Sequence, residues 1–284
     1  MHSGSGTALR DRVYRSEAIV IRRSDIGEAD RVLTILTPSG KRRVVAKGAR
    51  KTQSRLAGHI ELFTHTILML AIGRNLHIVT QSSPLDRFER LRADLERIGA
   101  AYYAAELADR LIEEESENRR AFELLLGVLR ALDAGASVDL TLRAYELHLL
   151  DALGYRPQLH ECASCGAVLT EATNRFSPAA GGALCPQCAG ADRQALPMSL
   201  PVFKLLRYLQ VQPPEMAGEL RISSTTCAAA ESLLRAYLRH ILERDLRSLA
   251  FLDDVRLMQH PDASASIRAL NGRHFAQGVD DERN

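Results

Sequence analysis

The sequence predicts an α+β chain of more than one domain: an N-terminal five-stranded β-barrel followed by an all-α domain with an embedded four-cysteine zinc knuckle. Three observations lead to this prediction. Short β-rich runs fill residues 17–83, apolar residues recur at helical spacing after Pro84, and two CxxC motifs interrupt the helical pattern. We therefore expect residues 1–83 to form the barrel domain with a short N-terminal extension, and residues 84–284 to form the helical domain.

Five β-rich runs build the predicted barrel. Turn signals at SDIGEAD, PSGK and GRN separate them, and the alternation of side chains is clearest at Val32, Thr34 and Leu36. Five strands in about 70 residues suit a small closed barrel. The runs are EAIVIRR, RVLTILT, RRVVAKG, ELFTHTILMLAIG and NLHIVTQ.

The helical domain begins with LDRFERLRADLERIGAAYYAAELADRLIEEE. Leu91, Leu95 and Ile98 follow one another at spacings of four and three residues, which predicts an amphipathic helix. Two more helices are expected in AFELLLGVLRAL and TLRAYELHLLDALG, with a turn at GASVD between them. The remaining helices and a polar tail are expected at residues 197–211, at residues 225–251 and from about Gln259.

The two CxxC motifs supply the strongest chemical signal. Cys162 and Cys165 form the first motif, and Cys185 and Cys188 form the second, inside a knuckle at residues 160–190. A CxxC turn brings two thiolates to one side of a backbone bend, and two such turns supply the four sulfur ligands that Zn²⁺ prefers. Because four cysteines leave no position open for water, we expect one structural Zn²⁺.

A disulfide pair and a redox CxxC are the other interpretations of these cysteines. A disulfide is disfavoured because the N-terminus MHSGSGTALRDRVY lacks an apolar signal-peptide core, and a redox site would need only one CxxC. Cys227 stands apart and is expected to be a small buried apolar residue. No run approaches the roughly 18 apolar residues of a membrane span, so we expect a cytoplasmic protein without a membrane partner.

Motifs of catalysis are missing from the sequence. It contains no Walker A signature, no GxGxxG after a strand, no GxSxG and no HExxH. The histidines are scattered along the chain and form no metal-binding or catalytic pattern. We therefore expect a protein that is not an enzyme and has no small-molecule substrate.

Positive charge is concentrated near the N-terminus. Residues 1–85 hold 14 Lys and Arg against 6 Asp and Glu, a net charge of +8, whereas the rest of the chain carries −6. Such an asymmetry suggests that the N-terminal part binds a polyanion, although a basic loop can also serve solubility alone. Residues 40–58, GKRRVVAKGARKTQSRLAG, contain seven basic residues and no carboxylate. The candidate contacts are Lys47, Arg50, Lys51 and Arg55, extended by Lys41, Arg43 and Arg74.

Four stretches together resemble the RecO family of bacterial recombination and repair mediators. They are GEADRVLTILTPSGKRRVVAKGARKTQSRLAG, YELHLLDALGYRPQLHECASCG, FSPAAGGALCPQCAG and LRAYLRHILERDLRSLAFL, and the resemblance covers about residues 17–252. It implies that the barrel is an OB-fold and that the zinc knuckle packs with the helical domain. It also implies binding of single- and double-stranded DNA, annealing of complementary strands, and a nucleoid-associated role with RecR and often RecF. In this role RecA is loaded onto strands coated by the single-strand-binding protein SSB.

The resemblance implies that the basic candidate residues of the N-terminal part contact DNA. Gly48 would let the backbone approach a phosphate closely. Residues 1–85 contain only two aromatic residues, Tyr14 and Phe63, so backbone charge is expected to dominate over base stacking. Binding should then be largely independent of sequence, and double-stranded DNA should compete.

The resemblance further implies a site for the acidic C-terminal tail of SSB on the helical domain. Such a site needs apolar walls, for which Leu125, Leu129 and Leu147 are candidates, and a basic rim. The alternative is that these leucines are core residues and the basic residues face solvent. A different function, that of a zinc-ribbon protein contacting RNA or the transcription machinery, also stays open. The candidate rim residues are Arg119, Arg120, Arg130 and Arg143.

Overall fold

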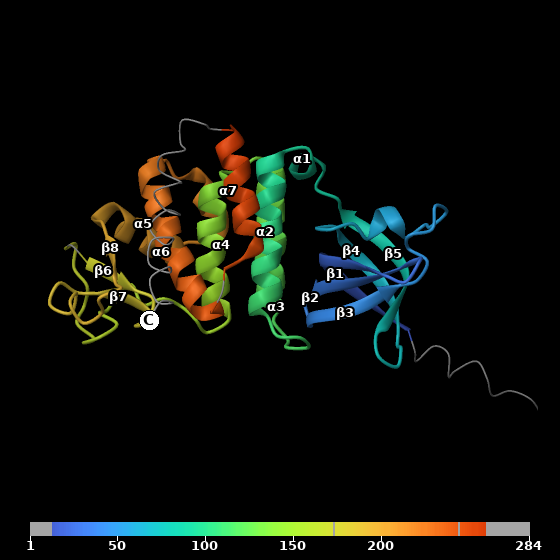
Figure 1. The fold of residues 1–284 in the computed structure, drawn as a ribbon, viewed down its shortest axis with the longest axis horizontal. Helices are drawn as coiled ribbons and strands as arrows, with labels where there is room; N and C mark the ends of the chain where they lie inside the picture. Colours follow the sequence, from blue (N-terminus) through green and yellow to red (C-terminus); the bar gives the residue numbers. More distant parts are fainter. Residues whose placement is uncertain (1–12, 173, 244, 260–284) are drawn as a thin grey trace, which may run out of the picture.

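The computed structural model describes residues 13–172, 174–243 and 245–259. A barrel, a central group of helices and a small sheet with two further helices lie in a row (Figure 1). The predicted class, a β-barrel followed by helices, is confirmed. The N-terminal extension and the polar tail after Gln259 lie outside the described residues.

The N-terminal part is a closed five-stranded barrel. Its strands follow the order β1-β2-β3-β5-β4, and β4 pairs with β1 to close the sheet. β3 and β5 are parallel, whereas the other neighbours are antiparallel. This is the Greek-key order of an OB-fold, which confirms the expectation from the resemblance. The strands are β1 (Val13–Ile26), β2 (Asp30–Thr37), β3 (Gly40–Ala46), β4 (His65–Ala71) and β5 (His77–Asp86).

Strand β1 contributes to two hydrophobic cores. Ala18 and Val20 point into the barrel, where they pack with Leu33. Ile19 and Ile21 point outward and belong to the core of the helices. Successive strand residues face opposite sides of a sheet, so both faces of this segment are buried. The barrel and the helices therefore share buried apolar surface.

The helices begin and end at capping residues. Asp94 accepts hydrogen bonds from the N–H groups of Glu96 and Arg97 at 2.9 and 3.1 Å, which begins the second helix. Asn118 begins the third helix, and Gly135, with a φ of 97°, ends it. None of the helices in the described ranges is both long and apolar enough to cross a bilayer. The helices are α1 (Glu89–Arg92), α2 (Leu95–Leu111), α3 (Arg119–Ala134), α4 (Val138–Ala152), α5 (Leu200–Val211), α6 (Ser224–Leu242) and α7 (Arg247–Gln259), with short 3-10 turns η2 (Ala57–His59) and η3 (Pro214–Glu219).

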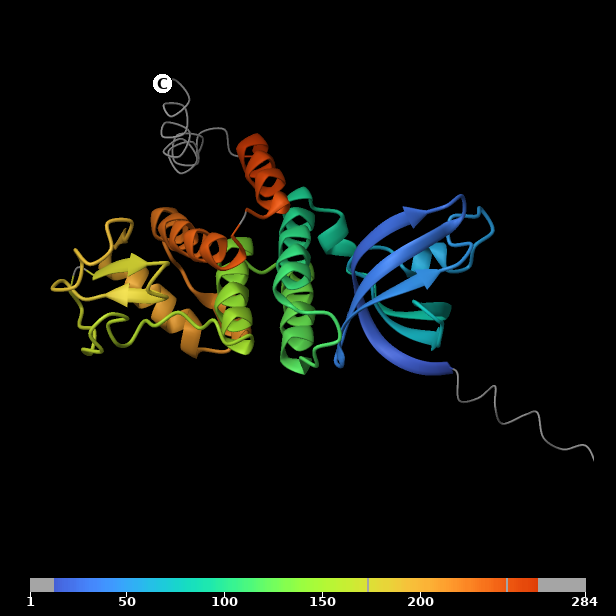
Figure 2. The same cartoon turned by 60° about the horizontal axis from the view of Figure 1, so that its bottom comes forward.

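Three element boundaries differ from the predictions. β5 includes Leu85 and Asp86, because Asp86 still pairs with β4, so the helical pattern starts later than expected. Leu196–Met198 forms a short strand, β8, and the helix predicted from residue 197 begins after it. The helix predicted over residues 225–251 breaks at Glu243, whose φ is 55°. After this break the chain turns back as α7, which packs against α2 (Figure 1 and Figure 2).

The turn between β2 and β3 docks onto the helices. The Nζ atom of Lys41 lies 3.4 Å from the Asp109 carboxylate and donates to the Asp109 carbonyl oxygen at 2.5 Å. The N–H of Glu115 donates to the carbonyl oxygen of Lys41 at 2.9 Å. A Cβ atom on Gly40 would lie 2.4 Å from the carbonyl oxygen of Ser116, so this contact requires glycine.

A buried ionic network joins α4 and α6. Arg143, which is 1% exposed, lies 2.5 Å from Glu146 and 3.1 Å from Glu231. Glu231 also pairs with Arg235 at 2.5 Å and with Arg256 of α7 at 3.0 Å. Burial raises the pKa of Glu231, but the three arginines lower it more, to about 2. The carboxylate is therefore charged in the folded protein.

Candidate metal centre and nucleic-acid interface

The four cysteines of the CxxC motifs converge on one point. Their sulfur atoms lie within 4.8 Å of one another, and the sulfurs of Cys165 and Cys185 are 3.8 Å apart. Sulfurs bound at about 2.3 Å to a tetrahedral ion are about 3.8 Å apart. Cys162, Cys165, Cys185 and Cys188 thus fit a tetrahedral metal site, as predicted.

The two knuckles are tight hydrogen-bonded turns. The N–H of Cys162 donates to the carbonyl oxygen of Ala167 at 2.7 Å, and the N–H of Gly166 donates to that of Cys162 at 2.9 Å. Gly166 has a φ of 73°, which glycine adopts without a side-chain clash. In the second knuckle the N–H of Cys188 donates to the carbonyl oxygen of Cys185 at 3.0 Å. These bends bring the paired thiols together.

A small sheet connects the knuckles to the helices. Its strand β7 runs directly into Cys185. The N–H of Ala163 donates to the carbonyl oxygen of Ala183 at 2.8 Å, and this hydrogen bond connects the first knuckle to β7. The ring of Phe176 meets that of Tyr237 on α6 edge-on, with centroids 5.7 Å apart. The metal site is therefore held against the helical part. The strands are β6 (Asn174–Ser177), β7 (Gly182–Leu184) and β8 (Leu196–Met198).

The thiols differ in how readily they ionise. Burial raises the pKa of Cys162, but backbone N–H groups, that of Cys185 first, lower it more, to about 6. The Ser164 hydroxyl lowers the pKa of Cys188, but the thiols of Cys165 and Cys185 raise it more, to about 12. Cys162 therefore ionises near neutral pH, whereas Cys188 needs a bound cation to lose its proton.

The fifth cysteine has the predicted structural role. Cys227 lies in the hydrophobic core of the helices and is 8% exposed. Burial raises the pKa of its thiol, which keeps the group neutral and unreactive. The prediction of a small buried apolar residue is confirmed.

The basic loop after β3 folds against the turn between β1 and β2. The N–H of Gly48 donates to Asp30 Oδ1 at 2.7 Å, and the N–H of Arg50 donates to the carbonyl oxygen of Ala29 at 2.9 Å. Gly48 has a φ of 64°, a left-handed conformation that glycine adopts without a side-chain clash. The loop closes one end of the barrel before the short turn η2.

Three cations of this loop have no counter-ion. Lys47, Lys51 and Arg55 are exposed, and none of them pairs with a carboxylate in the part of the chain that the structure describes. Arg50 is half exposed and lies 3.3 Å from Asp25. Unpaired cations leave a positive potential over the loop, which attracts anions. The structure thus brings together the four cations predicted for this loop.

The predicted DNA contact at Lys41 is wrong. Lys41 is 7% exposed, and its ammonium group is engaged by Asp109 of α2. On the strand it pairs with Leu36, and this face of the sheet packs against the helices. Arg43, two residues later, is exposed and remains a candidate.

Arg74 does not join the basic loop. It lies in the connection between β4 and β5, is exposed, and has no carboxylate partner in the described ranges. Val44 of β3 pairs with His77 of the parallel strand β5. Arg74 comes before His77 in the chain and Lys47 comes after Val44, and the two strands run in the same direction. Arg74 and Lys47 therefore lie toward opposite ends of the barrel. A nucleic acid touching both would have to cross the outer face of β3.

The groove predicted for the SSB tail is not formed by the predicted residues. Leu125, Leu129 and Leu147 are fully buried and belong to the core. Arg143 is buried in the ionic network, so its assignment to a basic rim is wrong as well. The three remaining arginines are exposed and paired: Arg119 with Glu123 at 2.9 Å, Arg120 with Asp151 at 2.9 Å, and Arg130 with Asp86 at 3.2 Å.

Comparison with protein families assigns both parts of the chain. The family model described as Recombination protein O N terminal matches residues 12–88, and the one described as Recombination protein O C terminal matches residues 92–250. The chain belongs to the RecO family. The boundary between the two RecO models falls at the junction of the barrel with the helices.

Curated RecO relatives match over nearly their whole length. The DNA repair protein RecO of Roseiflexus sp. (strain RS-1) is 78% identical over 274 residues, which cover 96% of this chain and 97% of the relative. Proteins of the same name from Dehalococcoides mccartyi strain 195 and Desulforudis audaxviator are 38% and 40% identical. These alignments cover 85% and 84% of this chain and 96% of each relative.

A hollow on the RecO C-terminal part was missed by sequence analysis. It lies between α5 and the start of α6, has a volume of about 410 Å³ and is mostly apolar. Leu205, Tyr208 and Ile222 contribute apolar surface, and Arg221 adds positive charge. Lys204 also lines the hollow and pairs with Glu171 at 2.8 Å. These residues come from two separate segments, and no spacing in the sequence relates them.

Sequence analysis also missed a row of arginines across the barrel end of this RecO-family chain. Arg31 lies 3.1 Å from Asp25 and 3.4 Å from Glu61. Arg23 pairs with the same Glu61, and Arg50 with the same Asp25. The row begins at the basic loop and leads toward the helices. Its members lie on β1, on β2 and in the loop after β3, so no local motif indicates the row.

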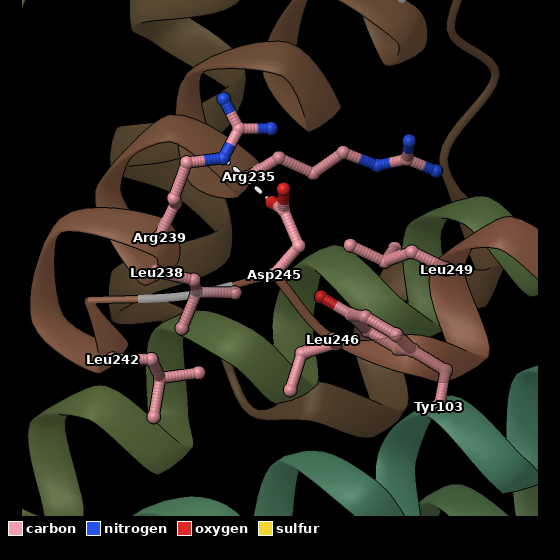
Figure 3. Close-up of a pocket in the computed structure, with 8 residues that line it drawn as sticks. All are labelled: Tyr103, Arg235, Leu238, Arg239, Leu242, Asp245, Leu246 and Leu249. Atoms are coloured by element: carbon pink, nitrogen blue, oxygen red, sulfur yellow. Dashed lines mark hydrogen bonds and ion pairs between the residues drawn. The ribbon is translucent and has the colours of Figure 1, made fainter.

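The hollow in Figure 3 is too small for a ligand. It lies between α6 and the start of α7, and its lining includes Tyr103 and four leucines. Arg239 and Asp245, which also line it, pair at 2.6 Å. Its volume of about 10 Å³ corresponds to a single water molecule.

Proposed function

We propose that this protein is a non-catalytic recombination mediator that binds single- and double-stranded DNA through the basic end of its OB-fold barrel. The observation that carries the proposal is the exposed loop with Lys47, Lys51 and Arg55, which have no counter-ion within the described ranges. Membership of the RecO family, whose relatives are named DNA repair proteins, supports DNA as the polyanion. Phosphate contacts of this kind carry no base information, so binding is largely independent of sequence.

The same surface supports an annealing role. Cations that neutralise the phosphates of two strands lower their repulsion and leave the base edges free to pair. With RecR, and often RecF, such a protein prepares SSB-coated strands for RecA, an activity that the family resemblance implies. This role places the protein in the cytoplasm at the nucleoid.

Strand annealing with and without SSB tests the proposal. Alanine replacement of Lys47, Arg50, Lys51 and Arg55 together should abolish annealing of complementary oligonucleotides in both conditions. A matched control removes four arginines of the helical part and the knuckle, and this control should anneal as wild type. Equal annealing by the loop variant and wild type would contradict the proposal. The control arginines are Arg119, Arg120, Arg156 and Arg193.

The metal in the four-cysteine site is proposed to be one structural Zn²⁺. The sulfur set and its 3.8 Å separation support zinc, and no position stays open for chemistry. Metal analysis should give one zinc per chain, and Cys162→Ser should lower both the metal content and the thermal stability of the knuckle. A Cys227→Ser variant should keep its zinc. Unchanged metal content in Cys162→Ser would contradict the assignment.

The hollow between α5 and α6 is the better candidate for the SSB tail. Its apolar surface and the cation Arg221 suit a peptide with an apolar end and acidic residues. Arg221→Ala should weaken binding of a labelled tail peptide, whereas Arg120→Ala on α3 should not. If Arg120→Ala weakened binding and Arg221→Ala did not, the binding site would lie on α3 instead.

The alternative function is a zinc-ribbon protein that contacts RNA or the transcription machinery. The same basic loop would bind RNA phosphates, so the charge alone does not separate the two functions. Annealing of SSB-coated DNA strands does separate them, because this activity is expected only of the mediator.

A further inference from the structure

The two aromatic residues of the barrel present little ring surface for base stacking. Phe63 is 1% exposed, and the Tyr14 hydroxyl is bonded to His77 Nδ1 at 2.6 Å beside a ring contact. Proteins that prefer single strands usually stack bases on exposed aromatic rings. If this chain offers such rings, they must therefore lie outside the barrel.

Two of the exposed aromatic side chains form a pair at the junction of barrel and helices. Tyr102 of α2 and Phe251 of α7 are each 41% exposed, and their ring centroids lie 6.2 Å apart. Tyr102 rests edge-on against Phe63 of the barrel at 4.9 Å. Phe251 lies over Gly99, where a Cβ atom would be 3.4 Å from its ring. The barrel therefore supports the Tyr102 ring, and α2 supports the Phe251 ring.

The arginine row ends at this pair. Arg92, in the last turn of α1, donates to the carbonyl oxygen of Leu62. Leu62 lies between Glu61, which pairs with the arginines of the row, and Phe63, on which Tyr102 rests. Arg92 also donates to the carbonyl oxygen of the exposed Arg87 at 2.6 Å. The start of α2 lies beside α1 and on the side of the barrel that carries the basic loop (Figure 1). The rings therefore adjoin a strip in which guanidinium groups outnumber carboxylates.

We propose that a single strand runs from the basic loop along this arginine row and stacks an unpaired base on the Tyr102–Phe251 pair. A strand with phosphates on one side and bases on the other matches a row of cations that ends at exposed rings. A duplex keeps its bases stacked internally and cannot make the ring contact. This inference rests on the proposed DNA binding, and it adds a preference for unpaired strands that the barrel alone does not provide.

Tryptophan fluorescence tests the ring contact directly, because the chain contains no tryptophan. A Tyr102→Trp variant should lose emission when an oligothymidine strand binds. An abasic oligonucleotide of equal length, which carries the phosphates without bases, should bind without this quenching. Tyr155→Trp, at another exposed tyrosine, is the matched control and should not respond to either strand.

Affinity measurements supply an independent readout. Tyr102→Leu should weaken single-strand binding roughly 5- to 100-fold, while the dependence on salt and the affinity for duplex stay unchanged. Tyr102→Phe keeps the ring and should bind as wild type. Phe251→Leu should behave like Tyr102→Leu, and normal zinc content in all variants checks that they are folded.

Normal single-strand affinity in Tyr102→Leu, together with unquenched Tyr102→Trp, would overturn the inference and leave the proposed function intact. Absence of any DNA binding by the wild type, measured by fluorescence anisotropy, would overturn both. If Tyr102→Leu instead abolished self-association of the protein and left DNA binding unchanged, the rings would belong to an interface between copies.

Discussion

The loop of residues 47–56 and the ionic network between α4, α6 and α7 are both built around basic side chains, but they differ in their carboxylates. In the loop, Lys47, Lys51 and Arg55 are exposed and lack a partner within the described ranges. In the network, Arg143 is fully buried and contacts two glutamates. The difference teaches that a cation buried against carboxylates serves folding, whereas an exposed cation stays available for binding.

Removing a member of the network should give the largest effect on stability. Arg143→Ala leaves the buried Glu146 carboxylate without its counter-ion, and it should lower the free energy of unfolding by about 3 to 5 kcal/mol. Urea denaturation measures this change. Lys51→Ala in the loop is the comparison and should change the stability by less than about 0.5 kcal/mol. Similar losses in both variants would break the contrast between the two regions.

The loop should dominate the salt dependence of DNA binding. Alanine at Lys47, Arg50, Lys51 and Arg55 removes about four phosphate contacts, so the slope of log affinity against log salt for single strands should fall by about 3. The stability should stay nearly constant, because removal of like charges relieves repulsion. Titrations at several salt concentrations measure the slope. A wild-type slope in this variant would reduce the loop to a solubilising surface.

Acid should weaken the network through Glu231. Its pKa is about 2 in the folded protein against an ordinary value of 4.5. Its stabilising contribution is therefore complete above pH 4.5 and is lost as the pH falls toward 2. Between pH 7 and pH 3 the loss should be about 2 kcal/mol. Glu231→Gln should remove this part of the pH dependence, whereas Glu123→Gln on the exposed face of α3 should keep it.

Lys41 and Arg43 compare a buried and an exposed cation within the single strand β3. Lys41→Ala should cost about 1 to 2 kcal/mol of stability, because Asp109 keeps only Arg22 of its two cationic partners. The salt slope should stay unchanged. Arg43→Ala should do the opposite, with little change in stability and a slope smaller by about 0.7. Equal behaviour of the two variants would show that burial does not separate their roles.

The barrel and the metal site could be predicted because their signals are local. Alternation in residues 17–83 gives the strands, and the spacing of the cysteines gives the knuckles. The burial of Lys41 and Arg143 could not be predicted, because it depends on their partners Asp109 and Glu231 in distant segments. The sequence around a basic residue does not indicate whether its side chain is buried against a carboxylate or exposed to solvent.

The other errors also have physical causes. The helix over residues 225–251 looked continuous because neither glycine nor proline stands at its break, which falls on Glu243 in a left-handed conformation. The leucines assigned to a groove have helical spacing that suits a core as well as a surface. The arginine row and the Tyr102–Phe251 pair each combine elements that meet only in three dimensions.

Strand β1 has a consequence for how the protein unfolds. Because Ala18 and Val20 support the barrel while Ile19 and Ile21 support the helices, neither core can open without disturbing the other. Only two residues separate β5 from α1, so no slack hinge divides the two parts. We therefore expect barrel and helices to melt together as one cooperative unit. The proposed DNA-binding surface spans their junction, so it should keep its shape until the whole unit unfolds.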